Sequence, residues 1–94
     1  MEIDRKLFNE KADLLKLIAH PIRLCILKGL IENGENNVSF MQSCLDVPQS
    51  TVSQHLAKLR TAGIIEDNRR GNEVYYKIKD DEVINIIKLL FNEN

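Results

Sequence analysis

The sequence has 94 residues, the size of a single domain, which we expect to span 1–94. Its 13 Lys+Arg and 14 Asp+Glu residues leave a formal net charge of −1. This balance excludes nucleic-acid binding through a large basic excess alone, but it allows binding through a local cluster of positive charge.

The sequence has no apolar run of about eighteen residues, so we expect no membrane-spanning helix. The charged N-terminus lacks the apolar stretch of a signal peptide.

Only two cysteines are present, Cys25 and Cys44. A disulfide framework is therefore not expected, and a cytoplasmic location is predicted. Cys44 shares an apolar helix face with Met41 and Leu45, which is typical of a buried small hydrophobic residue.

The first third of the chain is predicted to form two helices. Apolar residues at helical spacing indicate a helix at 4–19. Pro21 suits the first turn of a helix, so a second helix is predicted at 21–31. The polar segment 32–37 has the composition of a loop.

The next segment has the pattern of a helix-turn-helix at 39–62. Ser39 and Gln42 have capping-box spacing, which predicts a short helix at 40–45. After a break, a longer helix is predicted from Gln49 to Ala62.

The remaining residues predict a hairpin and a last helix. Segments 64–68 and 73–79 contain β-formers and are joined by four residues that include Gly71. A final helix is predicted at 80–91, where acidic residues favour the positive N-terminal end. Five helices with one hairpin, in this order, predict a mainly α winged helix-turn-helix in which 64–79 is the wing.

The fourth predicted helix has a polar face suited to reading DNA. Val52, Leu56 and Leu59 share the face expected to be buried. Gln can bond adenine through two hydrogen bonds, and Ser or Thr can reach phosphates or base edges. The alternative is an ordinary solvated helix face. The candidate contacts on this helix are Gln49, Ser50, Thr51, Ser53, Gln54 and His55, with Lys58 and Arg60 placed to hold the backbone.

Two arginines at the hairpin tip, Arg69 and Arg70, are further candidates for DNA contact. A wing tip with two guanidinium groups suits a narrow groove or its phosphates. The alternative is an exposed turn that serves only solubility.

The last helix is more apolar than a small core needs, which favours a homodimer. A helix that is apolar all round must be covered on more than one side. A two-fold interface between helices 4–19 and 80–92 would cover it, whereas the alternative is a helix docked only on its own core. The candidate dimer residues are Leu7, Phe8, Leu14, Leu15, Val83, Ile84, Ile87, Leu90 and Phe91.

The stretch from Val47 to Arg60, followed by Ala62-Gly63-Ile64-Ile65, resembles the signature of the ArsR family of winged-helix repressors. Ala19 to Leu24 and Val74-Tyr75-Tyr76 fit the same family at the right distances. The resemblance implies a homodimer that binds a palindromic operator, an imperfect inverted repeat in double-stranded DNA, and blocks transcription until a signal releases it. It also implies that the polar residues at 49–55 contact bases and phosphates, and that Arg69 and Arg70 are wing contacts.

The sensor positions of this family match only in part. The cysteine, aspartate, histidine or glutamate ligands of its metal-sensing members are missing, so we expect no metal and no cofactor. The chain is more similar to the non-metal-sensing PagR/HlyU-like branch, some members of which switch through cysteines in the second and last helices. Cys25 lies about one turn before that position, and the last helix has no cysteine. Cys25 remains a possible thiol sensor, and the effector is unknown.

The function predicted from the sequence is sequence-specific repression of transcription. The alternatives are a thiol-responsive regulator acting through Cys25 and a winged-helix protein-interaction module that does not bind DNA. No nucleophile–base pair or phosphate loop indicates an enzyme. The charge distribution fits DNA binding, since residues 48–79 hold six basic and three acidic residues, and the remainder holds seven basic and eleven acidic residues.

Overall fold

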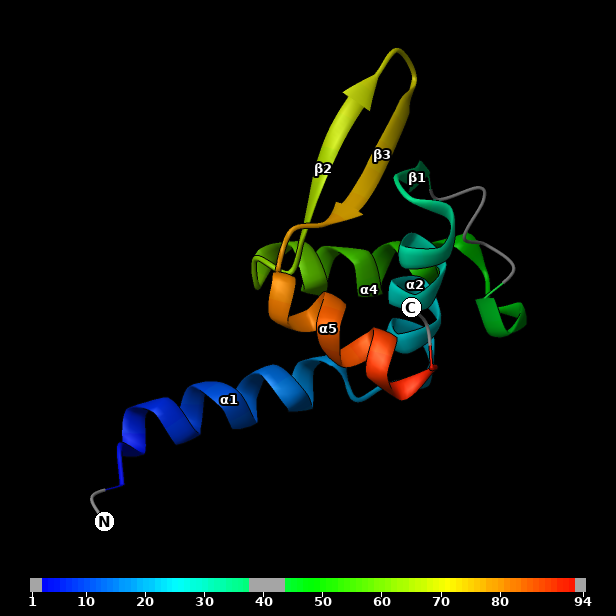
Figure 1. Cartoon of the computed structure of the whole chain (residues 1–94). Coiled ribbons are helices and arrows are strands. Elements are labelled where there is room, and N and C mark those ends of the chain that lie inside the picture. The colour runs from blue at the N-terminus through cyan, green and yellow to red at the C-terminus, as the bar shows by residue number, and fades with distance from the viewer. Residues whose placement is uncertain (1–2, 38–43, 93–94) are drawn as a thin grey trace.

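The computed structural model describes residues 3–37 and 44–92 (Figure 1). The predicted order of elements is confirmed where it can be followed. The described elements are α1 (Arg5–Ile18), α2 (Pro21–Asn33), β1 (Asn36–Asn37), the 3-10 turn η1 (Cys44–Asp46), α4 (Gln49–Thr61), β2 (Ile65–Arg70), β3 (Glu73–Ile78) and α5 (Asp81–Leu90). Most of the short helix predicted at 40–45, with its capping box, lies outside the described residues.

Local side-chain bonds define where the first two helices begin. The Asp4 carboxylate accepts a hydrogen bond from the Leu7 amide at 3.1 Å, which caps α1. His20 is extended, as a residue before proline must be, and its Nδ1 accepts from the Ile22 amide at 3.1 Å. His20 is therefore the N-cap of α2.

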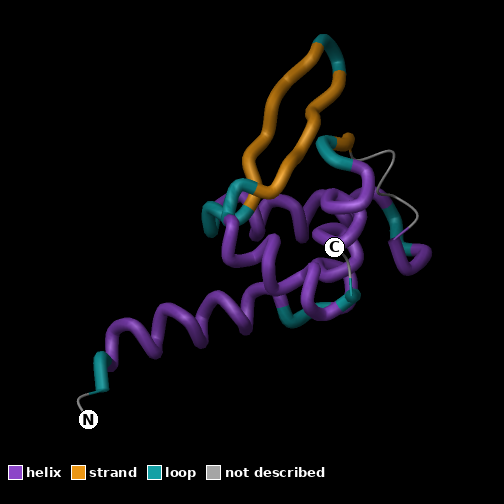
Figure 2. Tube along the Cα trace, viewed as in Figure 1, coloured by secondary structure: helices purple, strands orange, loops and turns teal. Residues whose placement is uncertain are grey.

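The core is built around α2, which packs against α4, α5 and the base of the wing (Figure 2). Its buried residues are all apolar: Ile18, Ile26, Leu27, Leu30, Val52, Leu56, Leu59, Ile64, Ile65, Val83 and Ile87. Among them α1 contributes only Ile18; Leu14 and Leu17 pack partly buried against the same core, and the N-terminal part of the helix projects away from the body. The described chain is accordingly long and narrow, with extents of 52 × 27 × 22 Å.

The wing is the antiparallel pair β2–β3, in which Ile65 pairs with Ile78 and Arg70 with Glu73. The predicted hairpin is confirmed, but the segment 32–37 is not all loop, because β1 pairs with the other edge of β3 and the sheet has the order β1-β3-β2. Asparagines are poor strand formers, so their place in a strand comes from the tertiary position of the chain beside β3. The second strand also runs to Arg70, two residues further than predicted.

Three residues, Ala62, Gly63 and Ile64, join α4 to the wing. Gly63 has φ +79°, a conformation that residues with a Cβ rarely adopt. The Ile64 carbonyl accepts from the Lys79 amide at 2.9 Å, which closes the base of the hairpin. None of the helices in the described ranges is long and apolar enough to cross a membrane.

Candidate nucleic-acid interface

Helix α4 presents a polar face on the side opposite the core. Val52, Leu56 and Leu59 are buried, as predicted. Of the predicted contacts on this helix, Gln49, Ser50, Ser53, Gln54, Lys58 and Arg60 are exposed, whereas Thr51 and His55 are half-buried. The exposed side chains occupy successive turns, so they can reach a single groove of a duplex.

The N-terminus of α4 has amide groups available for an anion. Its N-cap is Pro48, which makes no side-chain hydrogen bond to the helix. The intrahelical bonds begin with the Thr51 and Val52 amides, which donate to the Pro48 carbonyl, so the earlier amides have no partner within the helix and, with the helix dipole, favour a phosphate at this end. The basic residues Lys58 and Arg60 lie in the last turn, so positive charge is available at both ends.

Two of the predicted contacts on α4 already have protein partners. His55 Nδ1 accepts a hydrogen bond from Arg23 Nε at 3.1 Å. Arg60 lies 3.4 Å from an Asp67 carboxylate oxygen on β2. His55 is thus turned toward α2, because it lies on the flank of α4 next to the core rather than on its outer face.

The wing arginines have different surroundings. Arg69 is exposed and makes no ion pair with any described residue. Arg70 forms an ion pair with Glu35, which precedes β1, and its guanidinium lies 4.6 Å from the centre of the Tyr75 ring. Successive residues of a strand point to opposite faces, so the two arginines do not form one patch. The pairing of Glu35 with Arg70 was not predicted from the sequence.

The Tyr75 hydroxyl completes this cluster. It donates to Glu73 at 3.0 Å, and this bond to a carboxylate raises the pKa of the phenol above its ordinary value of 10.0. Glu73 also accepts from the Asn37 amide at 3.1 Å, which links β1 to the wing. The side of the wing facing β1 is therefore occupied by protein contacts.

The predicted dimer residues divide into two groups. Val83 and Ile87 are fully buried within their own subunit, and Leu14 packs against the same core. These three residues therefore attach α1 and α5 to the core and are not available to a second subunit. Ile84 is half-buried. The exposed large apolar side chains on or next to α1 and α5 are Ile3, Leu7, Phe8, Leu15, Leu89, Leu90 and Phe91.

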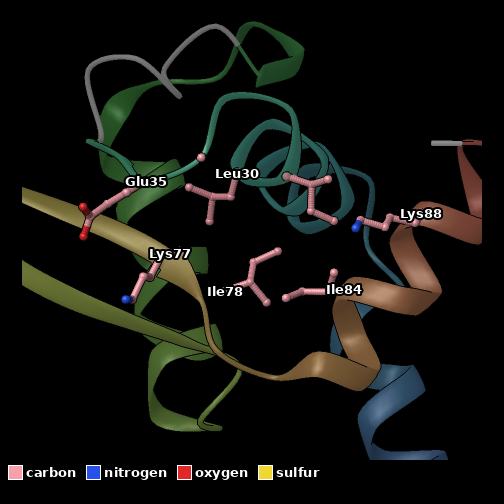
Figure 3. A pocket seen from close by; sticks show the side chains of 8 residues that line it. Leu30, Glu35, Lys77, Ile78, Ile84 and Lys88 are labelled. Carbon is pink, nitrogen blue, oxygen red and sulfur yellow. The ribbon is translucent and has the colours of Figure 1, made fainter. Parts of the chain in front are cut away.

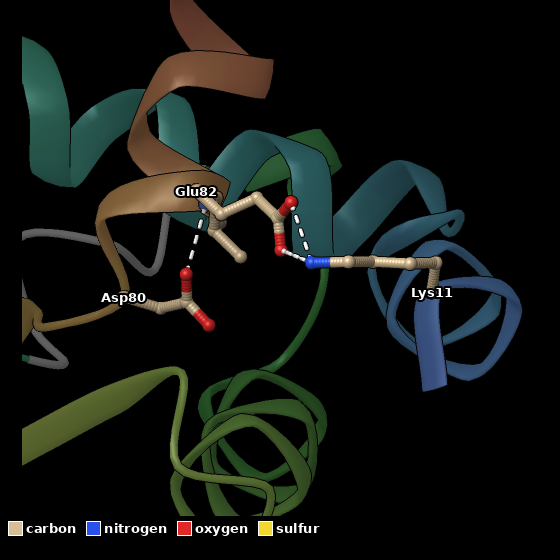
Figure 4. Close-up of polar contacts among 4 residues, drawn as sticks. Lys11, Asp80 and Glu82 are labelled. Atoms are coloured by element: carbon tan, nitrogen blue, oxygen red, sulfur yellow. Dashed lines mark hydrogen bonds and ion pairs between the residues drawn. The ribbon is translucent and has the colours of Figure 1, made fainter. Parts of the chain in front are cut away.

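An ion pair holds α1 beside α5 (Figure 4). Lys11 Nζ lies 2.8 Å from both carboxylate oxygens of Glu82, and this contact raises the pKa of the lysine. Asp80 caps α5 by accepting from the Val83 amide at 3.1 Å. Because both charged groups are exposed, this pair orients the helices more than it stabilises the fold.

A pocket of about 320 Å³ lies where α2, β3 and α5 meet (Figure 3). Leu30, Ile78 and Ile84 form its apolar part. Lys88 extends its ammonium group toward these side chains, whereas Lys77 points away from them. Lys77 is instead paired with Glu66, at 3.3 Å. The pocket thus adjoins both the wing and the last helix.

Cys25 differs from the sequence-based expectation. It is half-buried on α2, packs against the core and is disulfide-bonded. A disulfide framework was not expected, because the chain has only two cysteines and a cytoplasmic location was predicted. Spacing along the sequence does not show which sulfur atoms approach each other.

Comparison with known proteins identifies the family. The family model described as bacterial regulatory protein, arsR family, matches residues 20–67. The chain belongs to the ArsR family. It is 44% identical over 89 residues to the transcriptional repressor PagR of Bacillus anthracis, which covers 95% of this chain and 89% of PagR. It is 37% identical to the biofilm growth-associated repressor of Agrobacterium fabrum, over 88% of this chain and 70% of that protein.

Solved structures agree with this ArsR assignment. The crystal structure of PagR matches with a TM-score of 0.80 and covers 93% of this chain and 99% of PagR. HlyU from Vibrio cholerae matches with a TM-score of 0.85 at 34% identity, over 96% of each chain. The predicted winged helix-turn-helix fold and the likeness to the PagR/HlyU branch are confirmed. The protein is a DNA-binding transcriptional regulator of this family.

We predict that Glu35→Gln raises DNA affinity. The substitution removes the carboxylate that holds Arg70, and exposed ion pairs of this kind contribute about 0.2–1 kcal/mol. The expected gain is about two- to fivefold for any duplex, measured by fluorescence anisotropy at low salt.

The matched control is Glu32→Gln, which removes the same charge from a glutamate paired with Lys28. It is expected to give a smaller gain, due to net charge alone. Equal gains from the two variants would show that Glu35 acts only through its charge and not by holding Arg70.

Proposed function

We propose that this protein represses transcription as a homodimer bound to an imperfect inverted repeat in double-stranded DNA. The observation that carries the proposal is the exposed polar face of α4, where Ser50, Ser53 and Gln54 lie outward over a buried apolar face. Family membership supports repression, because the curated relatives PagR and the biofilm growth-associated regulator are both named repressors. The site of action is the cytoplasm, where bacterial DNA lies.

The residues of this surface differ in which groups of DNA they can bind. Gln54 has both a donor and an acceptor and can pair with adenine in the major groove, which supplies specificity. Lys58, Arg69 and the amides at the start of α4 can bind phosphates, which supply affinity without sequence preference. With a net charge of only −1, the protein depends on placed contacts more than on general attraction to DNA.

A homodimer is supported by the apolar surface of α1 and α5. Phe8 is 62% exposed and Leu90 is 57% exposed, although both are large apolar side chains on amphipathic helices. Exposed apolar surface of this kind typically marks a protein–protein interface. A second copy placed by a two-fold axis would cover it and present two α4 helices to two half-sites.

We predict that Gln54→Ala reduces sequence preference. If Gln54 makes a bidentate base contact, its loss costs about 1–3 kcal/mol of discrimination between the selected site and a scrambled duplex. The site is first selected from random DNA by the wild type, and both duplexes are then titrated by fluorescence anisotropy. Lys58→Ala is the comparison, since loss of a phosphate contact lowers the affinity for both duplexes about equally.

Wild type that bound scrambled and selected DNA equally would contradict sequence-specific repression. Wild type that bound neither duplex at low salt would favour a protein-interaction module.

We predict that Phe8→Asp separates the dimer into monomers. A carboxylate in an apolar interface is costly because its hydration is lost on association. Sedimentation velocity should show the monomer. The affinity for a duplex with two half-sites should fall by about a hundredfold or more, because two separate monomers no longer bind the two half-sites as one unit. Asn9→Asp adds the same charge at the adjacent exposed position and should remain dimeric. A Phe8→Asp protein that sediments as wild type would place the interface elsewhere.

A second candidate function, thiol-responsive regulation, is favoured by the disulfide at Cys25. Disulfides in a reducing compartment are mostly transient and serve catalysis or redox sensing. Cys25 packs against the core from α2, the helix that supports α4, so a change at this sulfur can reach the DNA-binding helix.

We predict that reductant changes the DNA affinity of the wild type and leaves that of Cys25→Ser unchanged. The disulfide links part of the fold covalently, so reduction should also lower the melting temperature of the wild type alone. Mass spectrometry of the intact protein reports the oxidation state at each step. Identical DNA affinity of oxidised and reduced wild type would rule out this candidate.

A further inference from the structure

Arg23 connects three elements through one side chain. It extends from α2, donates from Nε to His55 Nδ1 on α4 at 3.1 Å, and donates from an Nη to the Leu17 carbonyl of α1 at 2.8 Å. The guanidinium is planar and its donors form a fixed fork, so these two bonds restrict α1 and α4 together.

The bond to Leu17 satisfies a group that the helix itself cannot. The last four carbonyls of a helix have no partner within it. At the end of α1, the Leu15 carbonyl accepts a hydrogen bond from the Ala19 amide, and the Ile18 carbonyl accepts one from the His20 amide. The Leu17 carbonyl accepts its hydrogen bond from the Arg23 guanidinium. A cation at this end also complements the helix dipole.

The bond to His55 fixes the state of the imidazole. A guanidinium can only donate, so Nδ1 of His55 must be unprotonated and its single proton must be on Nε2. The His20 ring lies 4.4 Å away, tilted by 47°, and its Nδ1 accepts from the Ile22 amide. Burial, His20 and Arg23 together lower the pKa of His55 below its ordinary value of 6.5.

These contacts lie where α1 leaves the body of the protein. Only Ile18 of α1 is buried, while Leu7 and Phe8 are exposed along the projecting part. The direction of α1 therefore depends on its last turns, which Arg23 joins to α4, and on the exposed Lys11–Glu82 pair that links α1 to α5. In the proposed dimer, α1 contributes to the interface and α4 enters the groove, so the angle between them determines the distance between the two reading helices.

We propose that Arg23 is a positioning residue that, by joining Leu17 and His55, sets the half-site spacing that the dimer accepts. This inference rests on the proposed function. Arg23 itself need not touch DNA. Its loss should leave the affinity for one half-site intact and relax the choice between spacings.

The test compares Arg23→Met with wild type on duplexes selected from random DNA by the wild type. One duplex carries the selected inverted repeat, a second has two base pairs inserted between the half-sites, and a third has only one half-site. Wild type should prefer the selected spacing by about tenfold or more, whereas Arg23→Met should prefer it by about threefold or less. Lys28→Met removes the same charge from the same helix, where the lysine pairs with Glu32, and should behave as wild type.

A spectroscopic measurement tests the contact itself without DNA. Nitrogen NMR of the histidine rings should show unprotonated Nδ1 and protonated Nε2 for His55 in the wild type at neutral pH, and a mixture of tautomers in Arg23→Met. The charged or titratable groups acting on His55 are His20 at the α1–α2 junction and Arg23 on α2.

The pH profile adds a third readout. Because the contact needs neutral His55 and its pKa is lowered, spacing preference should be complete near neutral pH and should fall as the pH drops below 6.5. Arg23→Met should show no such fall. Retained spacing preference in Arg23→Met, or a protonated Nδ1 in the wild type, would overturn the proposal. Wild type that binds no DNA but has the expected tautomer would instead contradict the proposed function and leave the contact established.

Discussion

The burial of one face of α2 is the constraint on which the rest of this molecule depends. Ile26 and Leu27 are fully buried, and α4, α5 and the base of the wing all pack around them. A chain of 94 residues has few other apolar side chains for a second core. The inner faces of α4 and α5 are therefore committed to α2, and their outer faces are left for other molecules. The outer face of α4 is polar, whereas the end of α5 exposes Leu89 and Leu90, which supports the proposal that α4 binds DNA and α5 contacts a second subunit.

Sequence patterns predicted the helices well because the signals that begin and end them are local. Asp4, Pro21 and Asp80 each lie at or next to the start of a helix, and each acts within about one turn. The strand β1 could not be predicted in this way. Its pairing partner is β3, nearly forty residues further on, and the two asparagines that form it have no strand preference of their own.

The sequence predicted which residues form the candidate site, but not which of them bond to other residues of the protein. Helical spacing correctly placed Gln54 and Lys58 on the outer face of α4, since the apolar positions fix the orientation of the helix. It could not show that His55 is bonded to Arg23, or that Arg70 is paired with Glu35, because these residues are 32 and 35 positions apart. Contacts of this kind arise from the packing of whole elements, and they decide which polar side chains are free to meet DNA.

Gly63 has a consequence for how such a protein can change over evolutionary time. Only this left-handed residue and its immediate neighbours lie between α4 and β2, and the Gly63 and Ile64 amides bond back to the Arg60 and Leu59 carbonyls, so the helix and the wing are held at a defined angle. On the proposed function, exposed positions such as Ser53 and Gln54 can then be substituted to recognise a new sequence without changing the orientation of the wing. New operators can thus be acquired by exchanging a few surface side chains, while the frame that presents them is inherited unchanged.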